Sequence, residues 1–270
     1  MPEMRRMKPL LGTYVEVAQA GTGAAGAIEA AFDSIALAQA LWSFQDPASE
    51  LSRLNRSPGA VVPLSASTLR LLRAARAITA ASGGAFDCTL GGTLVALGVL
   101  PDHGGAEPLA RGGAGDIEIG RGWARLRRPV RITLDGIAKG FAVDLAVRAM
   151  RRAGAHGGWI NAGGDIRVFG DSVLPVQRRE LDGSYRPLGS LRRAAMASSR
   201  SGARDAAFPA HIIGLGQGTA ASGIWTVVAA TAWRADALTK VAAAAPPATR
   251  AGLVASLGGA MLEPVLEAAS

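Results

Sequence analysis

The stretch Leu134-Asp135-Gly136-Ile137-Ala138-Lys139-Gly140 is the most informative part of this 270-residue chain. The β-branched run Val130–Leu134 predicts a strand, and a helix is predicted from about Ala138 to Ala153, with Gly154 ending it. The first turn of a helix has unpaired N–H groups and a partial positive charge, so it attracts phosphate. Lys139 lies in that turn, where the helix dipole disfavours a cation, which indicates an anion nearby. The alternative is a solvent-facing lysine at the start of an ordinary helix.

Strands and helices are predicted on both sides of residues 134–140. Downstream, Gly158–Asn161 and Ile166–Phe169 read as strands joined by Ala162-Gly163-Gly164-Asp165, and Ile224–Ala229 reads as a strand before a helix at Ala232–Ala243. Upstream, we predict a strand at Thr13–Val17, a helix from Gly23 to about Trp42, and a helix from Ser67 to Ser82 with Ser67 as its N-cap. Residues 171–210 receive no element. Strands and helices that do not alternate regularly favour an α+β fold over a Rossmann fold, formed as a single domain over residues 1–270.

Three further motifs are individually weak. Ser82-Gly83-Gly84-Ala85-Phe86-Asp87 is either a helix C-cap leading into a strand or a turn whose backbone binds the edge of a heteroaromatic base. Asp236 and Thr239 lie three apart on one helix face and offer hard oxygen donors for Mg²⁺, although an aspartate at a helix start more often complements the dipole. His211 beside Ile212-Ile213 is more often structural than a metal ligand.

Composition excludes several classes of protein. The net charge is +8, but the arginines are scattered and aromatic residues make up only 5%, so we expect no nucleic-acid partner. Cys88 is the single cysteine and cannot form an intrachain disulfide; we expect a small core residue. No apolar run reaches the about 20 residues of a transmembrane helix. The N-terminus has no signal-peptide pattern, so we expect a cytoplasmic protein, or a periplasmic one if an export signal has been removed.

The order of the motifs resembles the FAD:protein FMN transferases of the ApbE family. The similar blocks extend from about residue 8 to 241 and include Leu11-Gly12-Thr13, Ser43-Phe44-Gln45-Asp46-Pro47, Gly83-Gly84-Ala85-Phe86-Asp87, Asp135-Gly136-Ile137-Ala138-Lys139-Gly140-Phe141-Ala142-Val143-Asp144, Asn161-Ala162-Gly163-Gly164-Asp165-Ile166-Arg167, His211-Ile212-Ile213 and Ala235-Asp236-Ala237-Leu238-Thr239.

The resemblance implies an α+β domain of two packed lobes, with mixed sheets and flanking helices, that holds FAD. It implies Mg²⁺-dependent transfer of FMN from FAD to a Thr or Ser hydroxyl of an acceptor flavoprotein, with release of AMP. The residues it implies for FAD are Leu11, Phe44, Ala85, Phe86, Asp87, Thr133, Lys139 and His211. Those it implies for the metal are the backbone oxygen of Gly136, Asp236 and a hydroxyl after Asp236, here Thr239. It assigns no catalytic nucleophile, because the partner protein supplies the attacking hydroxyl.

Four positions depart from the family pattern. Thr133 stands where many members have Asp, and Leu11 replaces the usual Met. Gly214-Leu215-Gly216-Gln217-Gly218 replaces the usual Asp-Pro-x-Thr-Gly segment, and Lys240 replaces a Thr that often follows the metal-binding Asp by four residues. Lys240 would repel a metal ion or occupy part of its place. Two alternatives to the transferase therefore stay open: a non-catalytic FAD-binding protein, and an FAD pyrophosphatase that yields FMN and AMP.

Overall fold

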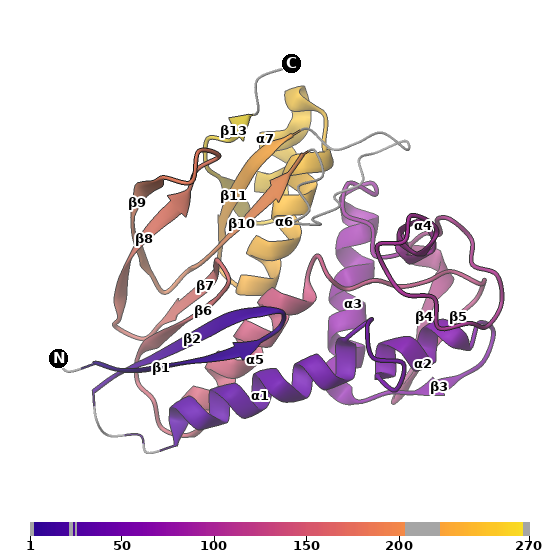
Figure 1. The fold of residues 1–270 in the computed structure, drawn as a ribbon, viewed down its shortest axis with the longest axis horizontal. Helices are drawn as coiled ribbons and strands as arrows, with labels where there is room; N and C mark the ends of the chain where they lie inside the picture. Colours follow the sequence, from indigo (N-terminus) through magenta and orange to yellow (C-terminus); the bar gives the residue numbers. More distant parts are fainter. Residues whose placement is uncertain (1–2, 22–23, 25, 203–221, 267–270) are drawn as a thin grey trace. The chain divides into compact units, whose positions relative to one another are not determined.

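The structure, a computed structural model, describes residues 3–21, 24, 26–202 and 222–266. The chain divides into a larger unit, Met1–Leu37 with Lys139–Ser270, and a smaller unit, Ala38–Ala138. Figure 1 draws both units as a ribbon, coloured along the sequence. Among the described residues, no helix is long and apolar enough to cross a membrane.

The larger unit is built on one antiparallel sheet in the order β1-β2-β6-β7-β10-β11-β12, with β13 also pairing to β11 (Figure 1). Its strands are β1 (Glu3–Leu10), β2 (Thr13–Ala20), β6 (Gly158–Ala162), β7 (Asp165–Phe169), β10 (Ala195–Ser201), β11 (Gly223–Ala229), β12 (Gly259–Met261) and β13 (Val265–Leu266). A separate two-stranded hairpin consists of β8 (Val173–Arg179) and β9 (Tyr185–Arg192). Hairpin turns join β1 to β2 and β6 to β7, so these neighbours in sequence are also neighbours in the sheet.

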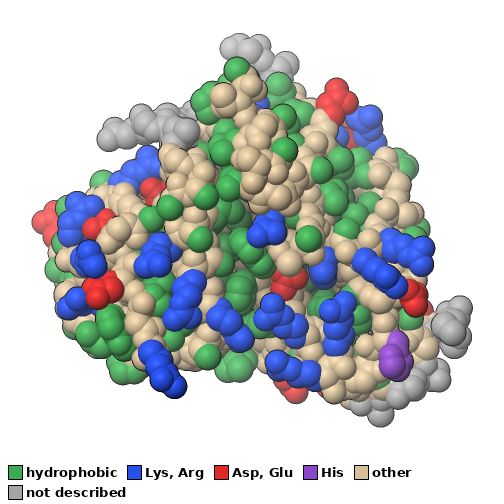
Figure 2. Space-filling view, turned by 180° about the vertical axis from the view of Figure 1, so that it is seen from behind, with side chains coloured by type: hydrophobic (Ala, Val, Ile, Leu, Met, Phe, Trp, Pro, Cys, Tyr) green, Lys and Arg blue, Asp and Glu red, His purple; other side chains and the backbone are tan. Residues whose placement is uncertain are grey.

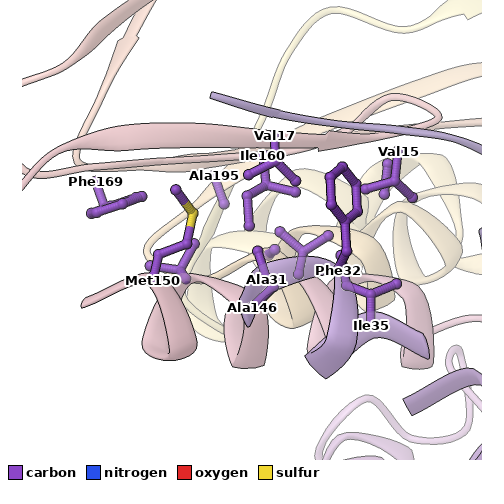
Figure 3. Close-up of a cluster of buried hydrophobic side chains, with 14 of the residues drawn as sticks. Val15, Val17, Ala31, Phe32, Ile35, Ala146, Met150, Ile160, Phe169 and Ala195 are labelled. Carbon is purple, nitrogen blue, oxygen red and sulfur yellow. The ribbon is translucent and has the colours of Figure 1, made fainter. Parts of the chain in front are cut away.

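Helices cover one face of this sheet. They are α1 (Ala27–Trp42), whose last turns belong to the smaller unit, α5 (Ala138–Arg152), α6 (Ala232–Ala244) and α7 (Pro247–Ser256). Figure 3 shows Phe32 of α1 and Met150 of α5 pointing toward the sheet, Phe32 beside Val15 of β2 and Met150 between Phe169 of β7 and Ala195 of β10. Each large apolar side chain buried in this way stabilises the fold by roughly 1.5–3 kcal/mol before the entropy cost of ordering it.

The other face of the sheet carries a second apolar cluster. Side chains alternate across a strand, so Trp159 and Val168 lie on the face opposite to Ile160 and Phe169. Val176 of β8 and Leu191 of β9 belong to the same cluster as Trp159. Strands β6 and β7 are therefore buried on both faces, by helices on one side and by the β8–β9 hairpin on the other.

The smaller unit has its own helices and a three-stranded sheet in the order β3-β5-β4. Its elements are α2 (Glu50–Arg56), β3 (Val62–Pro63), α3 (Ala66–Ala81), α4 (Gly91–Ala96), a 3₁₀ turn at Ala114–Asp116, β4 (Ile117–Ile119) and β5 (Trp123–Leu126). The α+β class is confirmed. Parallel pairing is limited, among the described residues, to an isolated bridge between Leu90 and Arg131.

Most of the predicted elements are confirmed with small shifts at their ends. The strand predicted at Thr13–Val17 extends to Ala20, and the helix predicted from Gly23 begins at Ala27. The two strands around Gly163-Gly164, the strand at Ile224–Ala229 and the helices at Ala138 and Ala232 are present. Residues 171–210, which had no predicted element, hold β8, β9 and β10.

Two predictions in the smaller unit are wrong. The N-cap of α3 is Ser65, not Ser67: the Ser65 hydroxyl accepts the N–H of Thr68, and its own backbone N–H donates to the Glu50 carboxylate at 3.0 Å. Glu50, fifteen residues upstream, favours Ser65 as the N-cap because its carboxylate binds the backbone N–H of Ser65.

The β-branched run Val130–Leu134 forms no strand beyond the single bridge at Arg131. The Asn55 side chain takes the place of a neighbouring strand, since it accepts the N–H of Ile132 at 2.7 Å and donates to the Ile132 carbonyl at 2.8 Å. Thr133 N–H donates to the carbonyl of Cys88. The run is extended and buried, but its backbone hydrogen bonds go to a side chain and a loop.

The positive charge is dispersed. Figure 2 shows Lys and Arg side chains distributed over one face, with Asp and Glu beside several of them. Arg125 and Arg127 both pair with Glu118, and Arg128 pairs with Asp116. Arginines in this part of the chain are therefore paired locally with carboxylates.

Candidate functional site: a lysine–carboxylate cluster at the start of α5

The N-terminus of α5 is held by a carboxylate from α6. Asp236 is fully buried, and its Oδ2 accepts the backbone N–H of Gly140 at 3.1 Å. The two helices approach so closely here that a Cβ atom on Gly140 would lie 2.4 Å from the carbonyl oxygen of Ala232 and 2.8 Å from the Cα of Trp233. Only glycine fits this contact without displacement of the α6 backbone.

The N-terminus of α6 is held in turn by a carboxylate from α5. Asp144 accepts the N–H of Ala232 at 3.1 Å and the N–H of Trp233 at 3.0 Å. Burial raises the pKa of Asp144, and these two hydrogen bonds act against that shift. Because each helix supplies the acceptor for the free N–H groups of the other, their first turns have one fixed arrangement.

Two lysines and two aspartates from α5, β7 and α6 form a group that we call the lysine–carboxylate cluster: Lys139, Asp165, Asp236 and Lys240. The Nζ atom of Lys139 lies 3.4 Å from Asp165 Oδ2, and the Nζ atom of Lys240 lies 2.5 Å from Asp236 Oδ1. The lysine side chains are 30% and 21% exposed, whereas the aspartates are at most 2% exposed. The lysine side chains are therefore partly exposed, whereas the carboxylates that they contact are buried.

The charges of the cluster act on one another. Burial raises the pKa of Asp165, the negative charge of Asp236 raises it further, and the two lysines oppose the shift. Asp165 in turn raises the pKa of Lys139, against the opposing effect of burial. The Lys139–Asp165 contact is an ion pair without hydrogen-bond geometry, since Asp165 Oδ2 has no hydrogen-bond partner. A ligand with negative oxygens at Lys139 would meet a protonated lysine.

Two hydroxyl groups complete the surroundings of Lys240. Ser199 Oγ accepts a hydrogen bond from Lys240 Nζ at 2.9 Å and lies 2.7 Å from Thr239 Oγ1. The Thr239 hydroxyl donates to the carbonyl of Asp236 at 2.7 Å, one turn back in its own helix. Thr239 is fully buried, and its hydroxyl is hydrogen-bonded to the Asp236 carbonyl and to the Ser199 hydroxyl.

The residues expected to bind Mg²⁺ do not fit that ion as the structure arranges them. One oxygen of Asp236 is bonded to Lys240 and the other to Gly140 N–H, and the Thr239 hydroxyl is already engaged. At an effective dielectric constant of about 20, a divalent cation about 4 Å from an ammonium group is repelled by about 8 kcal/mol. Among the described residues, no group of three or more His, Cys, Asp or Glu side chains could hold a metal.

The residues expected to bind FAD in the smaller unit are mostly buried in local structure. Phe44 stacks on His103, with ring centroids 6.1 Å apart, and its carbonyl is 2.7 Å from His103 Nε2. Ala85 N–H donates to the Ser82 carbonyl and Phe86 N–H donates to the Ser82 hydroxyl. In this arrangement neither N–H is available for the edge of a base. The predicted C-cap at Ser82 is confirmed, but a turn follows it instead of a strand.

Asp87 stabilises the same loop. Its Oδ1 accepts the N–H and hydroxyl of Thr89, and its Oδ2 accepts Arg111 Nε at 2.7 Å. Arg111 also donates to the carbonyl of Gly84, so it connects the carboxylate to the glycine turn. No local sequence pattern indicates this role for Arg111, because it lies 24 residues from Asp87.

The remaining predicted residues lie in different parts of the chain. Thr133 is buried, and Gly136 is half-buried in the turn before α5. Leu11 occupies the β1–β2 turn with a left-handed backbone (φ 56°), followed by Gly12 at φ 69°. His211 lies outside the described residues. The site roles predicted for these residues stay predictions.

Three residues that sequence reasoning had not singled out hold the cluster together. Asp144 and Asp165 were present in the blocks that resemble the ApbE family, but neither had been given a role. Ser199 lies in β10, a strand that was not predicted. Asp144, in the helix that contains Lys139, and Asp165, at the end of the β6–β7 turn, can both be seen in the sequence. Only the fold shows which groups they contact.

Comparisons with known proteins agree with this architecture. A sequence model of the ApbE family matches residues 11–262. The apo flavinyl transferase ApbE of Pseudomonas stutzeri has a TM-score of 0.83 at 19% identity, covering 99% of this chain and 92% of that one. The ApbE protein of Thermotoga maritima gives 0.81 at 24% identity, with 97% and 94% covered. The flavin transferase ApbE of Vibrio cholerae gives 0.79 at 18% identity, with 97% and 96% covered.

No curated protein sequence matches the chain. At identities of 24% or less, the three structures establish a shared fold. The family match is independent of them and spans most of the chain. From the sequence model and the fold together, this chain belongs to the ApbE family.

Proposed function

We propose that this protein is an FAD:protein FMN transferase. It takes FAD as donor, joins the FMN phosphate to a Thr or Ser hydroxyl of an acceptor flavoprotein, and releases AMP. Membership of the ApbE family supports the reaction class, and the names of two solved relatives, flavinyl transferase and flavin transferase, support it for the fold. The observation that carries the proposal is the pair of partly exposed lysines, Lys139 of α5 and Lys240 of α6, that contact buried carboxylates.

The chemistry needs such cations. The hydroxyl oxygen of the acceptor forms a bond to the FMN phosphorus, the phosphoanhydride bond to AMP breaks, and the hydroxyl releases its proton. Negative charge develops on the bridging and equatorial oxygens, and fixed cations stabilise it. Lys139 and Lys240 are held by Asp165 and Asp236 before substrate arrives, so little reorganisation is needed.

The test is an AMP-release assay with purified protein and FAD, run with and without an acceptor domain that presents a threonine. AMP formation that requires the acceptor, together with covalent flavin fluorescence on the acceptor in a denaturing gel, supports transfer. AMP formation without acceptor favours the pyrophosphatase alternative. Stoichiometric FAD binding with no AMP under either condition favours the flavin-binding alternative.

Lys139→Met tests whether the cluster is the phosphate site. We expect FAD affinity to fall by roughly 10-fold or more, because a charge-assisted hydrogen bond is worth about 1.5–3 kcal/mol. Lys8→Met is the matched control, since Lys8 forms an exposed pair with Glu29 on β1 and α1. Equal FAD affinity in wild type and Lys139→Met would place the phosphates elsewhere.

A further inference from the structure

Lys240 occupies the position at which a member of this family is expected to bind a divalent cation. It lies four residues after Asp236 on α6, on the same helix face, and its ammonium group contacts both Asp236 Oδ1 and Ser199 Oγ. These are oxygen donors of the kind that Mg²⁺ prefers, yet here they surround a lysine. The ammonium is a compact point charge with three donors, and two of them are directed at these oxygens.

We propose that the Lys240 ammonium replaces the divalent cation in this protein, so that Lys240 and Lys139 together neutralise the diphosphate of FAD and turnover needs no added metal. The inference rests on the proposed function and deepens it, because it assigns the electrostatic role to residues of the chain itself. Lys240 is a substrate-binding cation in this proposal, and no base or nucleophile is assigned to it.

The charge balance of the cluster supports this assignment. Two carboxylates, Asp165 and Asp236, are paired with two ammonium groups, so the cluster holds equal numbers of acidic and basic side chains. A bound diphosphate would then bring negative charge to two lysines whose side chains are each partly exposed. Adding Mg²⁺ at Asp236 would require Lys240 to leave its 2.5 Å contact and would also break its bond to Ser199.

The first experiment measures metal binding without flavin, so it does not depend on turnover. Mn²⁺ is titrated into wild type, Lys240→Thr and Lys8→Thr, and free Mn²⁺ is followed by electron paramagnetic resonance. We expect Lys240→Thr, which regains a hydroxyl and loses the competing charge, to bind one Mn²⁺ at least 10-fold more tightly than wild type or Lys8→Thr. Equal affinity in wild type and Lys240→Thr would overturn the proposal, whether both bind or neither does.

The second experiment measures AMP release from FAD, with the acceptor domain present, in EDTA and in Mg²⁺. Wild type and Lys8→Thr should keep their rate within about twofold in EDTA. Lys240→Met should lose roughly 100-fold in both conditions, the size of effect seen when one transition-state donor is removed. Lys240→Thr should be equally impaired in EDTA and recover in Mg²⁺. A wild-type rate that falls in EDTA and returns with Mg²⁺ would overturn the proposal.

The two experiments distinguish a failure of this inference from a failure of the proposed function. If no variant and no condition gives AMP, the proposed function fails, while the Mn²⁺ titration still decides whether Lys240 excludes a metal. Thermal melts of Lys240→Met and Lys240→Thr show that each variant is folded before either assay is interpreted.

Discussion

The carboxylate of Asp236 accepts the backbone N–H of Gly140 at 3.1 Å and, through its other oxygen, binds the ammonium of Lys240 at 2.5 Å. One buried side chain therefore determines both where α5 begins and where a cation of the candidate site is held. We therefore expect stability and ligand binding to be coupled at this residue, and variants of it have to be tested for both.

Removing one charge of the Asp236–Lys240 pair should destabilise the fold more than removing both. We expect Asp236→Asn and Lys240→Met each to lower the free energy of unfolding by about 2–4 kcal/mol, because each leaves a buried or half-buried group unpaired. The double variant should cost less than the sum, which urea unfolding measures as a double-mutant cycle. Additive costs would show that the two groups do not interact in solution.

Gly140→Ala should destabilise the protein although alanine is the better helix former. Its Cβ would meet the carbonyl of Ala232, so we expect a loss of about 1–3 kcal/mol as the two helix starts move apart. Gly252→Ala in α7 is the matched control, because nothing lies within 4 Å of a Cβ there and the helix should gain up to about 1 kcal/mol. Thermal melts of the two variants should therefore shift in opposite directions.

The β1–β2 turn stores strain at Leu11. Two central residues with positive φ make a type I′ turn, for which asparagine and glycine are preferred. Leu11→Asn should raise the unfolding free energy by about 0.5–1 kcal/mol, whereas Gly12→Ala should lower it by a similar amount. If Leu11 contacts flavin as the resemblance implies, Leu11→Asn will also weaken FAD binding, measured by flavin fluorescence. If Leu11→Asn is more stable and binds FAD with unchanged affinity, Leu11 is not part of the FAD site.

The thiol of Cys88 should be inert in the folded protein. Burial raises its pKa to about 12, so the reactive thiolate is absent from the native state at neutral pH. The unfolded thiol releases its proton near pH 8.5, so stability should fall as pH rises above that value, by about 1.4 kcal/mol per unit. The difference in urea unfolding between wild type and Cys88→Ala at pH 8, 9 and 10 isolates this effect. Rapid labelling of the native protein by a disulfide reagent would contradict it.

The parts of the fold that sequence predicts well are those whose signals are local. The Gly163-Gly164 turn and the helix after Gly136 are specified by residues within a few positions, and both are present as expected. Val130–Leu134 has an equally clear local signal for a strand. It fails because Asn55, 77 residues from Ile132, occupies the backbone groups that a neighbouring strand would have used. Strand propensity depends on local sequence and cannot show that a distant side chain takes up these backbone hydrogen bonds.

The same distinction applies to the candidate site. Lys139, Asp236 and Lys240 could be selected from motif order, and the unusual position of Lys240 was visible as a departure. Three other contacts could not be selected in this way: Asp165 with Lys139, Asp144 with the N-terminus of α6, and Ser199 with Lys240. Each joins residues 26 to 88 positions apart, which only the assembled sheet and helices bring together.

The exposed first strand has a consequence for the behaviour of the protein in concentrated solution. β1 has a single neighbour among the described strands, and nearly all of its side chains are exposed. A free strand edge is a template onto which a second copy of a chain can add, and natural proteins block such edges with charge and proline. Arg5, Arg6, Lys8 and Pro9 provide both here. A variant that replaces all four of these residues with valine should polymerise edge to edge, whereas a single substitution of Lys8 leaves the other three in place. The charges of Arg6 and Lys8, which pair with Glu29, are thus expected to protect the protein from aggregation.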